Sequence, residues 1–323
     1  MDIAEFQKRI DYQGDLQKLF QKISGDYNFG RLLSYNVVLQ GYEDLNVIVE
    51  TEKGKYFVKI FATFRDDKEA QRYVDIMNTA VNNGISHPKL FASPNGYLYT
   101  FTLDKTNIRL VVMKYIDGGD FFCIKEKPNL EEMKFLAGQA AKINMLNLNP
   151  KFVYDSWAIP NFLREYEKTK EDLDEDDRKI IKPLVEQFKL LHLDTLPHAF
   201  VHGDIIATNT IRSKNGNIYI IDFAVANYYP RIQELAVLLC DLFFINDKEK
   251  YLANYNLALK EYQKIIKLEQ KEIEILPIYI KLAHAMHIIP ATREKAKGNT
   301  LPENDFLLQS GQEGIRIATE IWG

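Results

Sequence analysis

The stretch HGDIIATN at residues 202–209, followed by IDF at 221–223, decides which fold we expect for this chain. A short loop of this kind can present Asp204 to a substrate hydroxyl and Asn209 to a metal ion, while a β-hairpin carries Asp222 back beside them. The intervening residues favour such a hairpin, because two β-rich runs flank a turn segment. Asn209 and Asp222 offer only oxygen, which suits magnesium. The spacing therefore predicts an ATP-dependent phosphotransferase with Asp204 as catalytic base, since phosphoryl transfer requires mainly alignment and charge neutralisation.

These residues resemble the motif of the aminoglycoside phosphotransferase and choline kinase-like family, which is His-Gly-Asp, four residues, Asn, then Asp. The resemblance implies an α+β, bilobal, protein-kinase-like fold. We expect a small lobe at residues 1–117, with an N-terminal helical segment, an antiparallel β-sheet and one clear helix, and a larger, mainly helical lobe at 118–323. It also implies ATP and Mg²⁺ as cofactors. Taken alone, His-Gly-Asp would be interpreted as a turn beside a buried histidine.

Upstream, the alternating pattern of KYFVKIF places Lys59 on a strand, where the phosphate-binding lysine of a kinase belongs. Asp66 and Asp67 can cap a following helix that Gly84 ends. Glu69 lies in the first turn of that helix and is the carboxylate we expect to pair with Lys59. The alternative is that Glu69 is simply a favourable charge at a helix N-terminus.

The segment LVVMKYIDGG at residues 110–119 reads as a buried strand that runs into a glycine-rich connector. It resembles the hinge between the lobes of kinases. The resemblance implies that Met113 lines the back of the nucleotide pocket and that the backbone of Lys114 and Ile116 bonds the purine. An ordinary core strand and turn would have the same composition.

Residues 38–49 predict a strand, a turn and a strand ahead of Lys59, where a kinase covers the phosphates. The segment contains a single glycine, Gly41, and its backbone amides can still cradle a phosphate. The family resemblance adds Asn46, because small-molecule kinases often carry an Asn near this position. By itself the segment would be interpreted as a plain hairpin.

Composition places the chain among ordinary globular proteins. Its 323 residues are 46% hydrophobic and 27% charged, which is enough for about two domains with a buried core. The net charge of -4 argues against a nucleic-acid partner, which would favour a basic excess. Cys123 and Cys240 lie far apart in apolar contexts, so neither a disulfide nor a zinc site is expected. The N-terminus lacks a signal-peptide pattern, and the longest apolar run, Leu235 to Ile245, is too short for a membrane span, so we expect a cytoplasmic protein.

The acceptor is expected to be a small hydroxylated molecule. Only 12 positions separate Asp222 from Glu234, which leaves no room for the long activation segment with which protein kinases dock a peptide. Candidate acceptors are an aminoglycoside, choline or ethanolamine, homoserine, and a sugar-like compound. Tyr228 and Tyr229 could flank a quaternary ammonium, Asp241 could hold an aminocyclitol, and Arg293 could clamp a carboxylate, although each residue also has an ordinary structural interpretation.

Two positions depart from the family pattern. Glu234 stands where the family usually has an aspartate that anchors the catalytic loop, and Ile206 stands where kinases often place a polar or basic side chain. His202 is interpreted as a residue that orients the loop. Two further functions remain open at this point: a catalytically silent pseudokinase that binds a partner, and a protein kinase.

Overall fold

The computed structural model describes residues 7–38, 43–299 and 302–323, which divide into two compact units. Unit 1 comprises Met1–Gly118 together with Ser213–Ile221, and unit 2 comprises Gly119–Arg212 together with Asp222–Gly323. The boundary expected after residue 117 lies one residue from the observed one. The segment Ser213–Ile221, however, groups with unit 1 and not with the C-terminal lobe to which we assigned it. The chain therefore leaves unit 2 within the catalytic hairpin and returns to it at Asp222.

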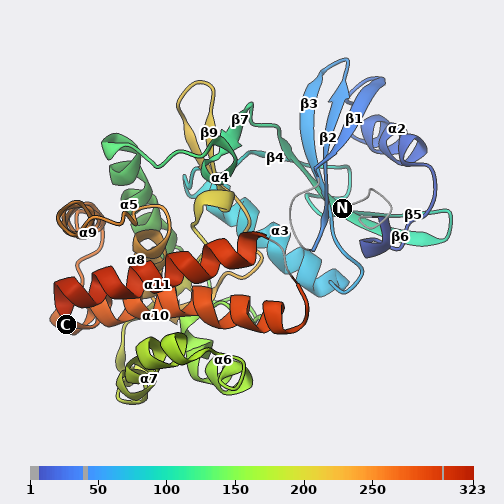
Figure 1. Ribbon diagram of the computed structural model, residues 1–323. Helices are drawn as coiled ribbons and strands as arrows, with labels where there is room; N and C mark the ends of the chain where they lie inside the picture. The colour runs from blue at the N-terminus through green and yellow to red at the C-terminus, as the bar shows by residue number, and fades with distance from the viewer. Residues whose placement is uncertain (1–6, 39–42, 300–301) are drawn as a thin grey trace. The chain divides into compact units, whose positions relative to one another are not determined.

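Unit 1 is built on an antiparallel sheet with the strand order β1-β2-β3-β6-β4, and β5 pairs with β6 (Figure 1). The pattern of β2 shows why the sheet forms: Leu45, Val47, Val49 and Thr51 alternate with more exposed residues, so one face of the strand is buried. The strands are β1 (Leu32–Val38), β2 (Leu45–Thr51), β3 (Gly54–Ile60), β4 (Leu90–Phe91), β5 (Tyr99–Leu103) and β6 (Thr106–Lys114).

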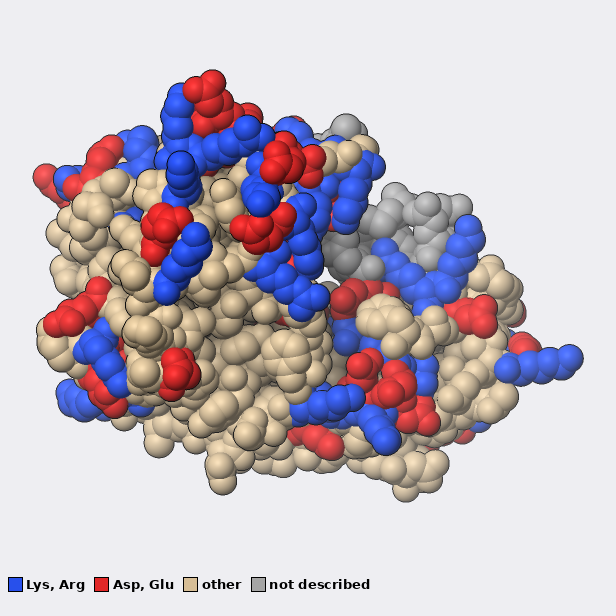
Figure 2. Space-filling view, turned by 90° about the horizontal axis from the view of Figure 1, so that it is seen from below, with Lys and Arg blue, Asp and Glu red and all other residues tan. Residues whose placement is uncertain are grey.

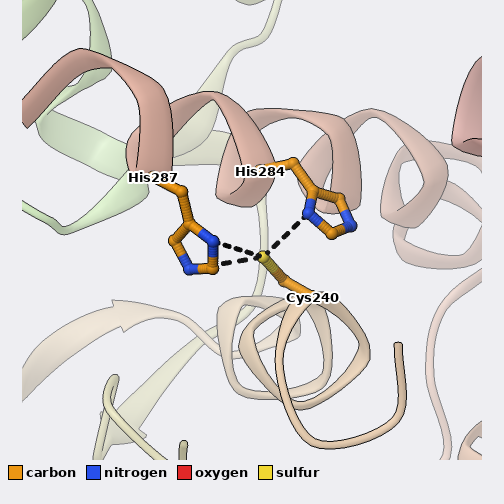
Figure 3. A group of neighbouring side chains, drawn as sticks. All are labelled: Cys240, His284 and His287. Atoms are coloured by element: carbon orange, nitrogen blue, oxygen red, sulfur yellow. Dashed lines mark hydrogen bonds between the residues drawn. The ribbon is translucent and has the colours of Figure 1, made fainter. Parts of the chain in front are cut away.

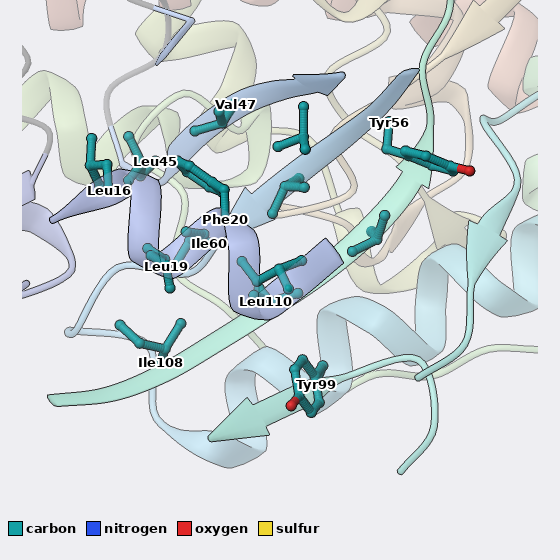
Figure 4. Packing of buried hydrophobic residues seen from close by; sticks show 14 of the residues in the cluster. Leu16, Leu19, Phe20, Leu45, Val47, Tyr56, Ile60, Tyr99, Ile108 and Leu110 are labelled. Atoms are coloured by element: carbon teal, nitrogen blue, oxygen red, sulfur yellow. The ribbon is translucent and has the colours of Figure 1, made fainter. Parts of the chain in front are cut away.

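An apolar core holds helix α2 (Leu16–Asp26) against this sheet (Figure 4). Leu19 and Phe20 of α2 belong to the same buried cluster as Val47, Ile60 and Leu110 of the strands. Burial of side chains of this size contributes about 1.5–3 kcal/mol each. The two central strands β3 and β6 are thereby fixed, and with them the backbone that carries Lys59 and Met113.

Helix α3 (Asp67–Asn82) follows the sequence expectation closely. The side chain of Asp66 accepts a hydrogen bond from the Glu69 N–H at 2.8 Å, as an N-cap should. Gly84 adopts a φ of 76°, the left-handed conformation that ends helices. The buried face of the helix is formed by Ala70, Tyr73, Val74, Ile76, Met77 and Ala80.

Unit 2 is mainly helical, with one short two-stranded sheet. Its helices are α4 (Phe121–Ile124), α5 (Leu130–Asn144), α6 (Phe162–Thr169), α7 (Glu175–Lys189), α8 (Ile232–Cys240), α9 (Lys248–Tyr262), α10 (Gln270–Ala296) and α11 (Pro302–Trp322). The strands β8 (His198–Val201) and β11 (Asn227–Pro230) pair in antiparallel register. Near the change of unit lie β7 (Gly118–Asp120), β9 (Thr210–Ser213) and β10 (Ile218–Ile220), with short 3₁₀ turns at Ile159–Asn161, Leu193–Thr195 and Ala207–Asn209. Together with unit 1, this confirms the predicted fold class of a β-sheet part followed by a helical part.

Helix α10 forms the centre of unit 2 and runs alongside α11 (Figure 1). Among the described residues it is the one helix with the length and apolarity to cross a membrane, and most of its apolar window is buried inside the protein. That burial fits the core helix of a soluble protein.

Charged side chains of both signs are interspersed on the face shown in Figure 2. The distribution agrees with the small net charge of -4.

Candidate active site

The β8–β11 pair positions the catalytic loop within unit 2. Val201, the last residue of β8, pairs with Asn227, the first residue of β11. The loop of residues 202–209, which follows β8, therefore starts beside the end of the segment that leads from Asp222 into β11. Gly203 has a φ of 81°, which a residue with a side chain adopts only with strain.

Glu234 anchors the start of this loop. Its carboxylate accepts hydrogen bonds from the His202 N–H at 2.7 Å and the Gly203 N–H at 3.2 Å, and the amide of Asn144 lies at 3.5 Å. Burial raises the pKa of Glu234 to about 7, although the two backbone bonds act in the opposite direction. The longer side chain thus fills the anchoring role that the family assigns to aspartate.

Asp204 is held by its two loop neighbours. The Asn209 side-chain amide donates to Asp204 Oδ2 at 2.6 Å and to the Asp204 carbonyl at 3.1 Å. The Asp204 N–H donates to Nδ1 of the fully buried His202 at 3.2 Å. His202 therefore orients the loop, as expected, and the structure brings the predicted base together with one predicted metal ligand.

Asp222 opens the segment after the hairpin with a φ of 70°, a left-handed conformation that aspartate tolerates better than most residues. Its Oδ1 accepts from the Ala224 N–H at 3.3 Å, which holds the turn. Phe223 is fully buried, and its ring lies 4.3 Å from that of His202. This packing ties the Asp222 turn to the catalytic loop.

Four carboxylates share this part of unit 2. The pKa of Asp204 is raised well above its ordinary value of 3.8, first by burial and then by the charges of Asp155, Asp222 and Asp241. The hydrogen bond from Asn209 acts in the opposite direction. Like charges that disfavour one another in this way are relieved by a bound cation.

Asp155 was not singled out from the sequence. It reaches the site because Asn227 of β11 bonds both the N–H and the carbonyl of Val153, at 3.0 and 2.8 Å, and so fixes the preceding loop. The only signal in the sequence was a polar residue in a loop between helices, which is too common to identify a site. The contact between residues 153 and 227, which are 74 positions apart in the chain, decides where Asp155 lies.

The donor set in this region fits a magnesium ion. Asp222 and Asn209 offer carboxylate and amide oxygens, the ligands that magnesium takes from proteins, and the carboxylates of Asp155 and Asp241 act on the same loop. Asp241 is already engaged in holding the loop, because its Oδ1 accepts from the Ala207 N–H at 2.7 Å. Asp241 therefore acts as a brace for the loop.

In unit 1 the structure corrects the partner of Lys59. The Lys59 ammonium lies 3.2 Å from Asp44, whose side chain is only 2% exposed and also accepts from Arg65 and from the Ala62 N–H. No ion pair joins Lys59 to Glu69 in the described part of the chain. The reason is the sheet register: Lys59 on β3 pairs with Asn46 on β2, two residues after Asp44. The carboxylate therefore comes from the neighbouring strand turn and not from the helix.

The remaining predicted nucleotide contacts also lie in unit 1. Met113 is buried on β6, and Ile116 is buried just beyond that strand. The Lys114 N–H donates to the Lys89 carbonyl at 2.8 Å, so a purine contact at Lys114 would use its carbonyl. Oδ1 of Asn46 is buried without a hydrogen-bond partner in the described residues. Gly41 lies outside the described residues.

The acceptor candidates of the sequence have structural partners. Arg293 of α10 forms an ion pair with Glu165, whose side chain is fully buried and is also bonded by Lys168 and Tyr154. Tyr228 is exposed and Tyr229 is buried, so the two rings do not form a matched pair around a cation. Burial, with a contribution from the charge of Asp155, raises the pKa of Tyr229 to about 12.

Unit 1 contains an antiparallel sheet with one long helix, and unit 2 is helical and carries the His-Gly-Asp loop with its Asn and Asp. These features together define a small-molecule kinase of the protein-kinase-like fold. The chain belongs to the phosphotransferase enzyme family, whose model matches residues 34–266. The resemblance stated from the motif is therefore confirmed, and the protein is a phosphotransferase.

Individual relatives agree with this assignment. A homoserine kinase of Parvibaculum lavamentivorans strain DS-1 is 22% identical over 263 residues, which cover 78% of each chain. The structure of a microcompartment-associated aminopropanol kinase matches with a TM-score of 0.70 at 12% identity, covering 95% of this chain and 97% of that one. An amicoumacin kinase in complex with AMP-PNP and Ca²⁺ matches with a TM-score of 0.67 at 16% identity, covering 97% and 96%. These structural matches establish the fold.

Proposed function

We propose that the protein transfers the γ-phosphate of ATP, in the presence of Mg²⁺, to a hydroxyl group of a small molecule. The observation that carries this proposal is the geometry around Asp204: a carboxylate held at 2.6 Å by Asn209, in a loop whose first two N–H groups are bound by Glu234. Membership of the phosphotransferase family supplies the reaction class.

Asp204 is proposed as the base that orients and deprotonates the acceptor hydroxyl. Burial and three neighbouring carboxylates raise its pKa, which strengthens it as a proton acceptor. Asn209 and Asp222 are proposed to hold the magnesium ion. When bound, magnesium neutralises charge on the nucleotide phosphates. The anchored loop contributes by fixing Asp204 in one position before the substrate arrives, because correct orientation supplies a large part of such rate enhancements.

On the nucleotide side, Lys59 is proposed to bind the phosphates, with Asp44 taking the orienting role that we had expected of Glu69. A buried carboxylate beside the ammonium keeps that lysine charged and limits its rotamers. Met113, the Lys114 carbonyl and Ile116 are proposed to contact the purine. Asn46 and Gly41 remain proposed contacts of the phosphate-covering turn.

For the acceptor we propose a hydroxylated amine, with homoserine the first compound to test. Support comes from the relatives, which include a homoserine kinase and an aminopropanol kinase. The acidic surroundings of Asp204 fit an acceptor that carries an ammonium group. Arg293, bound to Glu165, is not proposed as the carboxylate clamp.

The test is a coupled assay of ADP release with homoserine, aminopropanol, ethanolamine, choline, sugars and aminoglycosides as acceptors. Asp204→Asn should lower transfer by roughly 10²–10⁴-fold, the usual contribution of a general base, with ATP affinity retained. Asp194→Asn, an exposed residue in the turn before β8, serves as the matched control and should keep full activity.

Three results would contradict the proposal. Loss of ATP affinity in Asp204→Asn would place that residue at the nucleotide instead of the acceptor. Absence of any thermal stabilisation by ATP with Mg²⁺ would favour a catalytically silent pseudokinase. Phosphorylation of protein substrates without phosphorylation of any small alcohol would favour a protein kinase.

A further inference from the structure

A second group of potential metal ligands lies in unit 2 and contains no residue of the proposed reaction. Cys240 at the end of α8 points toward two histidines of α10, His284 and His287 (Figure 3). Its Sγ lies 3.3 Å from His284 Nδ1 and 3.6 Å from His287 Nε2. The three residues can offer one ligand atom each within 4.8 Å of one another. The histidines are three positions apart, so both lie on one face of the helix.

The chemistry of this group differs from that of the Asp204 region. Thiolate sulfur and imidazole nitrogen favour zinc and related transition metals, whereas magnesium takes oxygen. In a tetrahedral zinc site with bonds of about 2.3 Å to sulfur and about 2.0 Å to nitrogen, sulfur and nitrogen ligands are separated by about 3.5 Å. The two measured separations are close to that value. We propose that Cys240, His284 and His287 form a binding site for a divalent ion of the zinc class, with a fourth position open to an exchangeable ligand.

The surrounding helices are shaped to keep these side chains in place. A Cβ at Gly314 of α11 would lie 2.1 Å from the His284 ring, so only glycine allows the ring its position. Phe244 packs edge-on against the same ring at 4.9 Å. Cys240 and His284 are buried, and His284 Nε2 has no hydrogen-bond partner in the described residues. His287 is the one partly buried residue of the three.

The site is connected to the catalytic loop by one residue. Asp241 follows Cys240 in the chain, and its Oδ1 accepts from the Ala207 N–H at 2.7 Å. The Lys127 ammonium donates to the Asp241 carbonyl at 2.7 Å. An ion that joins Cys240 to α10 would therefore brace the end of α8 and, through Asp241, the loop that contains Asn209. The proposed ion site does not depend on the proposed function. Only the brace would affect the catalytic loop and therefore rests on that function.

Titration of the purified, reduced and chelator-treated full chain with Co²⁺, in excess Mg²⁺, tests the site. We expect one Co²⁺ per chain, with a thiolate-to-cobalt charge-transfer band and the intense visible bands of tetrahedral cobalt, both displaced by one equivalent of Zn²⁺. Cys240→Ser should abolish the charge-transfer band. His287→Gln should weaken binding by more than about 100-fold, because removing a ligand costs more than removing a partner behind one. The matched control is Cys123→Ser, which changes the other, exposed cysteine and should bind like the wild type.

The outcomes separate the proposal from an ordinary buried thiol that is hydrogen-bonded to a histidine. No charge-transfer band in the wild type, or a band that survives Cys240→Ser, would overturn the site. Circular dichroism of the metal-free variants checks folding. If Cys240→Ser does not fold, His287→Gln at the partly buried position decides, and unchanged Co²⁺ affinity there would overturn the site.

Hydrogen exchange tests the brace separately. Zn²⁺ should slow exchange of the Ala207 amide in the wild type and in Cys123→Ser. Unchanged exchange of that amide, with zinc bound, would refute the brace. Absence of any kinase activity would bear on the proposed function alone.

Discussion

Neutralising Glu234 should change how the stability of the protein depends on pH. The folded-state pKa of Glu234, about 7, lies above the ordinary value of 4.5 because the carboxyl group is buried. The folded protein therefore binds this proton more tightly than the unfolded chain does. The stability that follows is fully present below about pH 4.5 and is lost as the pH rises through about 7. Since one pKa unit corresponds to about 1.4 kcal/mol, the loss amounts to about 3 kcal/mol.

Glu234→Gln removes this titration with little change of side-chain volume. It also replaces one of the two oxygens that accept from the His202 and Gly203 N–H groups, which should cost about 1–3 kcal/mol at every pH. Urea unfolding of both proteins from about pH 5 to about pH 9 should show the free-energy advantage of the wild type shrinking by about 3 kcal/mol. The exposed Glu131→Gln controls for loss of a carboxylate. If the difference in free energy of unfolding between the wild type and Glu234→Gln stays constant or grows as the pH rises, the reasoning is refuted.

Three further sets of substitutions test other features of the structure. Lys59→Met should abolish tight ATP binding and cost about 3 kcal/mol of stability, because Asp44 stays buried with one partner fewer. Adding Asp44→Asn should restore only part of that stability, because the buried Arg65 then loses a carboxylate partner. It should not restore ATP affinity, and restored affinity would contradict the role of Lys59. Gly203→Ala and its control Gly216→Ala replace glycines with φ values of 81° and 80°, so each should lower the free energy of unfolding in urea by about 1–2 kcal/mol. Only Gly203→Ala should slow ADP release. Equal activities of the two variants would argue against a strained catalytic loop. Arg293→Met should destabilise unit 2 by about 3 kcal/mol, because it removes a partner of buried Glu165, and leave the acceptor KM unchanged; a raised KM would restore the carboxylate clamp.

Features that depend on local pattern were predictable from the sequence. The α3 helix begins at the cap residue Asp66 and ends before Gly84, because capping and left-handed φ are properties of short segments. The catalytic loop was predictable for a related reason, since Asp204 and Asn209 are five residues apart and a single tight loop brings them together. The reaction class followed from these residue types and their spacing.

Features that depend on distant pairing were not predictable. Asp44 and not Glu69 contacts Lys59 because of the β2–β3 register, and a register shift of one residue would send a side chain to the other face of the sheet. Asp155 reaches the Asp204 region through bonds between Val153 and Asn227.

The distance along the chain between interacting residues explains which of these features the sequence could predict and which it could not. Caps, turns and short loops are determined by neighbours along the chain, so the amino-acid order alone specified the phosphotransferase motif and the elements that carry it. Which carboxylates gather around Asp204, and the meeting of Cys240 with His284 and His287, depend on how whole helices and strands pack. Such packing minimises exposed apolar area over the entire unit, and only the tertiary structure records its result.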